Sequence, residues 1–363
     1  MSVTVAAILV LALTLYACTG IADYGAGFWD LTAGGRDRGR LPRSLIDNAV
    51  TPVWEANHVW LIYVLVLCWT GFGSTFASVM STLYIPLALA LLGIVLRAAG
   101  FAMSKDAARA RMRHLAGWLF GVGSFLTPFC LGTAVGAVLT GRIPVGNAAG
   151  DEITSWLNPS SILAGLLTVA VGAYVSAVYL LAEAHRHGTA ALHGYFRFRA
   201  RAAGVTGLLL GLGLLLALHV DERQMFDRVV QRGWPLLLLS LALLAGSFRL
   251  AAGVRVWRMR LVAAGGIAAL VGAWAVAQYP YLLPFSLTVQ DGAAGPATLR
   301  WLLIWFVGAL VLVVPALILL FWLDQKGELG EDPATSRIPA QGGSVQEGSS
   351  VQEGSVQEGS AQA

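Results

Sequence analysis

The stretch WLLIWFVGALVLVVPALILLFW (Trp301–Trp322) contains no charged residue and is long enough to cross a lipid bilayer as one helix. The hydrocarbon core of a bilayer is about 30 Å thick and requires about 20 mostly apolar residues per helix. Across the 363 residues, 57% are hydrophobic and 12% are charged, which is typical of an integral membrane protein. Leucine, alanine, valine and glycine dominate the apolar segments, and this composition favours helices over barrel strands.

Nine hydrophobic segments together predict an all-α integral membrane protein with about nine transmembrane helices. The segments are centred on residues 3–29, 53–73, 77–101, 115–139, 160–182, 202–219, 234–252, 261–279 and 301–323. The loops after the first, third, fifth and seventh segments are rich in arginine, whereas the other loops hold fewer basic residues. Because cytoplasmic loops carry an excess of Lys and Arg, we predict an N-terminus outside and a C-terminus in the cytoplasm.

The composition changes abruptly after Trp322. From Gly342 onward the chain repeats the polar sequence SVQEGS, with almost no hydrophobic residues. Such a segment cannot bury enough apolar surface to offset the entropy cost of folding. We therefore predict a transmembrane domain over residues 1–325 and a disordered, low-complexity cytoplasmic tail over residues 326–363.

The sequence TPVWEANHVWLI (Thr51–Ile62) raises a second question, because three polar side chains stand at the mouth of an apolar run. These are Glu55, Asn57 and His58. The run that follows, Val59–Phe72, is too short to cross a bilayer alone. The helix must therefore begin near Pro52, a residue suited to a first helical turn, and must carry the polar groups into the membrane. Glu55 and His58 are three residues apart and share one helix face.

Asp23 is expected at a similar depth. It lies near the cytoplasmic end of the first helix, which runs opposite to the second. Ionisable groups at such a depth commonly mark proton or ion routes. Burial and mutual proximity shift the pKa of the Glu55 and His58 side chains in opposite directions, so we expect proton exchange near neutral pH. A purely structural interpretation stays open, in which Glu55 occupies a favourable first-turn position and His58 joins Trp54 and Trp60 in an interfacial belt.

Other motifs are weaker or missing. Arg97 and Arg249 stand near cytoplasmic helix ends, where we expect their side chains to extend to the interface. The three cysteines lie in apolar segments without partners at ligand spacing, so we predict neither a disulfide framework nor a metal site. The sequence contains no Walker-type GxxxxGK[ST] and no dinucleotide fingerprint after a strand. His58 is the only histidine inside a predicted span, so the chain lacks the axial ligands that several haems would need.

Five stretches resemble the second subunit of cytochrome bd quinol oxidases, in order and in matching helices. They are DYGAG (Asp23–Gly27), PVWEANHVWLI (Pro52–Ile62), STLYIPLALALLGIVLRAAGF (Ser81–Phe101), WLNPSSILAGL (Trp156–Leu166) and YPYLLPFSLTVQDGAAGPATL (Tyr279–Leu299). The second stretch is similar to the family pattern PVWDGNEVWLI. Glu55 stands at the aspartate of that pattern and His58 at its glutamate, so one carboxylate is kept and the other is replaced.

The resemblance implies a haem-free membrane subunit of a terminal oxidase that couples quinol oxidation to the reduction of oxygen to water. A haem-bearing subunit I would form a pseudo-symmetric heterodimer with it, and would hold haems of the b and d types. The resemblance also leads us to expect a bacterial cytoplasmic (inner) membrane, a small single-helix subunit, and a structural quinone or lipid. We expect no nucleic acid partner.

The same resemblance implies a route for cytoplasmic protons toward the partner subunit. The predicted relay consists of Asp23, Glu55 and His58. The supporting residues are Asn57, which would orient them, and the nearby Trp54 and Trp60. Two alternatives are a structural scaffold, whose polar motif only packs helices, and a small-solute or ion permease that acts without a haem partner. Transporters often contain helices broken near the middle of the membrane, and Pro128 is the one clear candidate for such a break.

Overall fold

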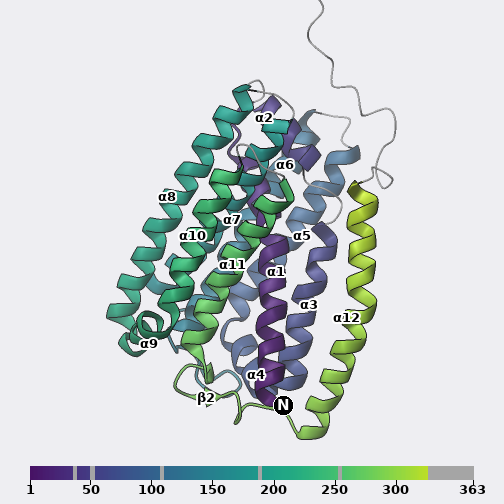
Figure 1. Cartoon of the computed structure of the whole chain (residues 1–363). Helices are drawn as coiled ribbons and strands as arrows, with labels where there is room; N and C mark the ends of the chain where they lie inside the picture. Colours follow the sequence, from purple (N-terminus) through teal and green to yellow (C-terminus); the bar gives the residue numbers. More distant parts are fainter. Residues whose placement is uncertain (36–38, 50–53, 107–109, 187–189, 252–255, 326–363) are drawn as a thin grey trace, which may run out of the picture. The chain divides into compact units, whose positions relative to one another are not determined.

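Helices make up almost all of the described chain (Figure 1). The computed structural model describes residues 1–35, 39–49, 54–106, 110–186, 190–251 and 256–325. The α-helices are α1 (Ser2–Leu31), α2 (Arg40–Ala49), α3 (Trp54–Gly71), α4 (Gly73–Thr82), α5 (Tyr84–Asp106), α6 (Ala110–Leu139), α7 (Pro159–Arg186), α8 (Ala190–Asp221), α9 (Arg223–Arg228), α10 (Trp234–Leu250), α11 (Val256–Gln278) and α12 (Pro296–Gln325). The remaining elements are a π-helix, η1 (Val229–Gly233), and an antiparallel hairpin of β1 (Tyr281–Leu283) and β2 (Leu287–Thr288).

Eight spans in the described residues are long and apolar enough to cross a membrane, and a bent pair of helices supplies a ninth. The eight are α1, α5, α6, α7, α8, the continuous Arg223–Leu250, α11 and the first part of α12. The ninth is α3 followed by α4, which meet at an angle of 120°. The predicted all-α membrane protein with about nine spans is therefore confirmed. The predicted orientation of the two termini stays a prediction.

The third predicted segment begins later than expected because the chain turns before it. Residues 77–82 belong to the short α4, and the long α5 starts only at Tyr84. At the bend, Phe72 leaves the helical conformation, with φ −141° and ψ 56°. Its side chain is fully buried in a cluster with Val5 and Leu299. The free energy gained by burying this ring offsets the loss of helical hydrogen bonds at the bend.

The centre of the bundle is built on α1, which packs against α3, α6, α7 and α11. Small residues permit this close packing. A Cβ atom on Gly25 of α1 would overlap the carbonyl oxygen of Gly172 on α7, so only glycine fits at this crossing. Trp29 closes the same interface, where its indole nitrogen donates a 2.7 Å hydrogen bond to the carbonyl oxygen of Ala173. These contacts place Asp23 and Tyr24 inside the bundle.

Two prolines lie inside long helices without ending them. Pro128 falls within the continuous α6, so the predicted break in this helix is wrong, and Pro315 falls within α12. The chain divides into a compact unit, Met1–Ala316, and a second unit, Leu317–Ala363, whose described part is the end of α12. The predicted tail over residues 326–363 lies outside the described residues.

Candidate functional site

Three helices bring polar side chains around one small cavity, and five of these side chains stand beside Tyr16 there. Asp23 and Tyr24 come from α1, Asn57 and His58 from the start of α3, and Arg97 from α5. The cavity has a volume of about 10 Å³, which is room for about one water molecule. The helices around it are otherwise mostly apolar, so this polar cluster is a local exception in the bundle. We call these five residues the polar cluster.

Asn57 ties α3 to α1 through its side-chain amide. The Nδ2 atom donates a 2.7 Å hydrogen bond to the Oδ2 atom of Asp23 and a 3.1 Å bond to the backbone oxygen of Thr19. Asn57 is buried, with 7% of its surface exposed. Because hydrogen bonds to charged groups stabilise by about 1.5–3 kcal/mol, this contact fixes the Asp23 carboxylate in place. The predicted orienting role of Asn57 agrees with this geometry.

Arg97 and Tyr24 are the members of the cluster that the sequence did not assign to the site. The Arg97 side chain is 1% exposed, so the prediction that it extends to the interface is wrong. Its Nη1 atom donates hydrogen bonds to the backbone oxygen of Asp23 at 2.9 Å and to the hydroxyl of Ser124 at 2.7 Å. The guanidinium also lies over the rings of Tyr24 and Phe120, 5.0 and 4.6 Å from their centres. These contacts compensate the buried positive charge.

A line of exchangeable groups leads from His58 along α1. The hydroxyl of Tyr24 lies 3.3 Å from the Nε2 atom of His58, and the hydroxyls of Tyr24 and Tyr16 lie 3.1 Å apart. Both tyrosines are buried, whereas His58 is half-buried. Hydroxyl groups donate and accept hydrogen bonds at once, and imidazole can do either through its two nitrogens. The three groups therefore form a chain of hydrogen-bonding groups along α1 that can relay a proton.

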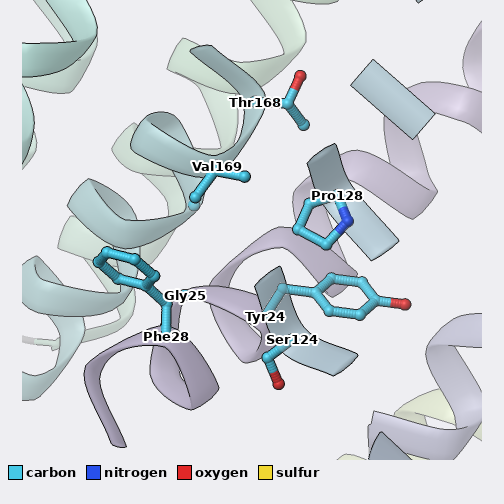
Figure 2. Close-up of a pocket in the computed structure, with 8 residues that line it drawn as sticks. Tyr24, Gly25, Phe28, Ser124, Pro128, Thr168 and Val169 are labelled. Carbon is cyan, nitrogen blue, oxygen red and sulfur yellow. The ribbon is translucent and has the colours of Figure 1, made fainter. Parts of the chain in front are cut away.

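The far side of Tyr24 is closed. Figure 2 shows Tyr24 with Ser124 and Pro128 of α6 at a crevice that Phe28 and Val169 also line. This crevice has no room for a water molecule. Of these two cavities, the one between α1, α3 and α5 has room for a water molecule.

The predicted site residues meet only in part. Asp23, Asn57 and His58 come together as expected. Trp60 is half-buried on α3 and does not line the cavity. Glu55 and Trp54 lie in the first turn of α3, but their side chains are outside the described part of the structure, so their roles stay predictions.

Among the described residues, no group of three or more His, Cys, Asp and Glu side chains is arranged to hold a metal ion. His58 is the histidine of the polar cluster, and its Nε2 atom faces the hydroxyl of Tyr24. The polar cluster contains a carboxyl group, an imidazole and a phenol hydroxyl, which are groups that can exchange protons.

Residues 1–324 match the model of the family described as cytochrome bd terminal oxidase subunit II. The chain belongs to this family. A relative in Bacillus subtilis (strain 168), the cytochrome bd ubiquinol oxidase subunit 2, is 23% identical over 324 residues, which cover 86% of this chain and 92% of the relative. The cytochrome bd-I ubiquinol oxidase subunit 2 of Escherichia coli (strain K12) is 28% identical over 174 residues, which cover 46% of this chain and only 44% of the relative.

A solved structure supports the fold of this bd oxidase subunit II family member. A chain in the structure of bd oxidase from Geobacillus thermodenitrificans aligns with a TM-score of 0.73 and 24% sequence identity. The alignment covers 89% of this chain and 98% of that chain. At this identity the likeness shows the fold, and the multi-pass architecture is the same.

Proposed function

We propose that this chain is the haem-free subunit II of a bd-type terminal oxidase in a bacterial cytoplasmic membrane. The complex would oxidise quinol and reduce oxygen to water, and a haem-bearing subunit I would carry the b- and d-type haems. Family membership supports the assembly with such a partner. A small single-helix subunit and a structural quinone or lipid belong to the same proposal.

The polar cluster would supply protons from the cytoplasmic side to the partner. The observation that supports this role is that Asp23, Asn57, His58 and the buried Arg97 line one cavity with room for about one water molecule, where Asn57 bonds the Asp23 carboxylate and Arg97 bonds the Asp23 backbone. A buried arginine balances the charge of an ionised carboxylate in the membrane, so Asp23 can release a proton without leaving a large uncompensated negative charge. The line from His58 to Tyr16 extends the exchangeable groups along α1.

Glu55 would lie upstream of this cluster. It is two residues before Asn57 and three before His58, in the first turn of the same helix. Residues three apart on a helix share a face, so Glu55 is well placed to collect protons for His58. Because the resemblance places an acidic residue at this position, we keep Glu55 in the proposed relay, together with the packing roles of Trp54 and Trp60.

The relay can be tested with Asp23→Asn in the complex purified from its native membrane. The amide keeps the shape of the carboxylate and its contact with Asn57, but it cannot exchange the proton. Because the amide leaves the charge of Arg97 uncompensated, we expect less assembled complex, and in the complex that does assemble we expect quinol-driven oxygen consumption per haem to fall at least about tenfold. Asp221→Asn is the matched control, because Asp221 is a carboxylate near the opposite helix ends, bonded to Ser160.

Two other outcomes separate the alternatives. If Asp23→Asn lowers the haem content but not the turnover per haem, the polar cluster is a structural feature and the chain is a scaffold. If the native chain purifies without haem or a second hydrophobic subunit, the oxidase proposal fails and a permease becomes the favoured function. The geometry disfavours a permease, because a cavity of about 10 Å³ has no room for a solute larger than water.

A further inference from the structure

Arginines gather at one end of three helices that do not contribute to the polar cluster. α8 carries Arg197 and Arg201, α10 carries Arg249 in its last turn, and α11 carries Arg258 in its first turn. All four are exposed. The sequences of these three helices contain a single carboxylate, Asp221, at the opposite end of α8. This end of the helices therefore has a strong excess of positive charge.

Contacts across the helices bring these ends together. The guanidinium of Arg201 lies 5.8 Å from the ring centre of Phe248 on α10. Tyr174 of α7 touches both helices, because its hydroxyl donates a 2.6 Å bond to the backbone oxygen of Leu244 and its ring lies 3.2 Å from the place of a Cβ atom on Gly204. α10 and α11 pack along each other as an antiparallel pair. The arginines of α8, α10 and α11 therefore lie at one end of neighbouring helices (Figure 1).

Below the arginines, the exposed faces of α8 and α10 are apolar. On α8 the exposed side chains recur every three to seven residues and form a stripe: Phe198, Val205, Leu209, Leu212 and Leu216. Leu238 and Leu241 are exposed in the same way on α10. Arg201 falls within the helical spacing of the α8 stripe, between Phe198 and Val205, so the charge and the apolar surface belong to one helix face.

We propose that this end of α8, α10 and α11 binds the headgroup of an anionic phospholipid, whose acyl chains lie along the apolar stripe. Arginine forms paired hydrogen bonds with phosphate oxygens, and an aromatic residue beside it suits the membrane interface. Basic groups between transmembrane helices attract anionic headgroups, and leucine side chains at membrane depth match hydrocarbon chains. The charge and the depth of this surface therefore favour lipid.

Glu183 is the one carboxylate in the sequence of α7, the helix that packs against α8. Glu183 is half-buried in the last turn of α7. One carboxylate against four exposed arginines leaves a net charge of about +3, from the residue types alone. The surface therefore stays positive at every pH at which a phospholipid phosphate is ionised.

The test measures lipid retained by the full chain, purified with whatever subunits accompany it. Equal amounts of dioleoyl phosphatidylglycerol and dioleoyl phosphatidylcholine are added in mild detergent, and the bound lipids are quantified by mass spectrometry after washing. We expect a clear preference for phosphatidylglycerol. Arg201→Gln should reduce this preference about fivefold, because each basic residue near an anionic lipid surface contributes a factor of about five in affinity. Arg111→Gln, at an exposed arginine of α6, should leave the preference unchanged.

Three results would overturn the proposal. The first is equal retention of the two lipids by the wild-type protein. The second is an equal loss of preference in Arg201→Gln and Arg111→Gln. The third is displacement of bound phosphatidylglycerol by soluble glycerol 3-phosphate, which would indicate a site for a free phosphate. If Arg201→Gln fails to fold, Arg197→Gln replaces it, and raising the ionic strength from about 0.05 to about 0.5 M should weaken the preference of the wild-type protein. Lipid preference is read without oxygen consumption, so this result is independent of the proposed oxidase function.

Discussion

Replacing Arg97 with methionine tests the energetics of the polar cluster. Arg97 is 1% exposed, bonds Asp23 and Ser124, and lies over two aromatic rings. The carboxylate of Asp23 lies close enough to the guanidinium to interact with it electrostatically. Removing one partner of a buried charge pair costs about 3–5 kcal/mol, because the other charge stays buried without compensation. Methionine fills a similar volume and adapts its shape, so the cavity left behind adds little.

We therefore expect Arg97→Met to lower the free energy of unfolding by about 3–5 kcal/mol. The assay is equilibrium unfolding of the full chain in mixed detergent micelles. Neutralising the carboxylate as well should recover part of the loss, so Arg97→Met combined with Asp23→Asn should be more stable than the sum of the single effects by about 2–3 kcal/mol. Arg111→Met removes an exposed arginine and serves as the control. An additive double variant, or an Arg97→Met protein within about 1 kcal/mol of the wild type, would refute the account of a compensated buried charge.

Two further predictions concern packing and a loop. Gly25→Ala should destabilise the chain by at least about 1–3 kcal/mol, because the new Cβ atom meets the backbone of Gly172. Gly194 has open space around the Cβ position, so Gly194→Ala should be neutral or stabilising by up to about 1 kcal/mol. Thermal unfolding midpoints of the two variants distinguish these effects. Backbone hydrogen bonds, the strongest from Thr154, hold the pKa of Asp151 below its usual value. A lowered pKa means that the ionised carboxylate stabilises the folded loop, and this stabilisation is lost when the carboxylate is protonated below about pH 4. Acid-stable proteases should therefore cut this loop faster below that pH, and Asp151→Asn should remove the pH dependence.

The sequence predicted the membrane architecture because long apolar segments leave few alternatives. Each helix must satisfy its backbone within the segment, so length and hydropathy almost determine the number of spans. The bend at Phe72 was not predictable in the same way. The sequence predicted that the second span ends at residue 73 and that the third begins at residue 77, and only the tertiary burial of the Phe72 ring fixes a separate α4. A contact with Val5, far away in the sequence, decides that local structure.

The sequence predicted three of the five members of the polar cluster. Asp23, Asn57 and His58 could be brought together because consecutive helices run in opposite directions, and topology alone then sets their depth. Arg97 was missed because the predicted span ended at residue 101, only four residues further on. The helix in fact continues to Asp106, so Arg97 lies nine residues, or about 13 Å, before its end. At that distance the side chain does not reach the interface, and it must find partners inside the bundle.

The histidine at position 58 changes the charge balance that this buried arginine imposes. The family pattern that the sequence resembles has a carboxylate at this position, which would add a second negative charge beside Asp23. His58 instead faces the hydroxyl of Tyr24 and is neutral or positive. With Arg97 already in place, a protonated His58 would leave an excess of positive charge in a medium where such charge is costly. The replacement of this carboxylate by His58 therefore leaves Asp23 as the acidic side chain of the polar cluster, so the charge of Arg97 is balanced by one carboxylate and not by two.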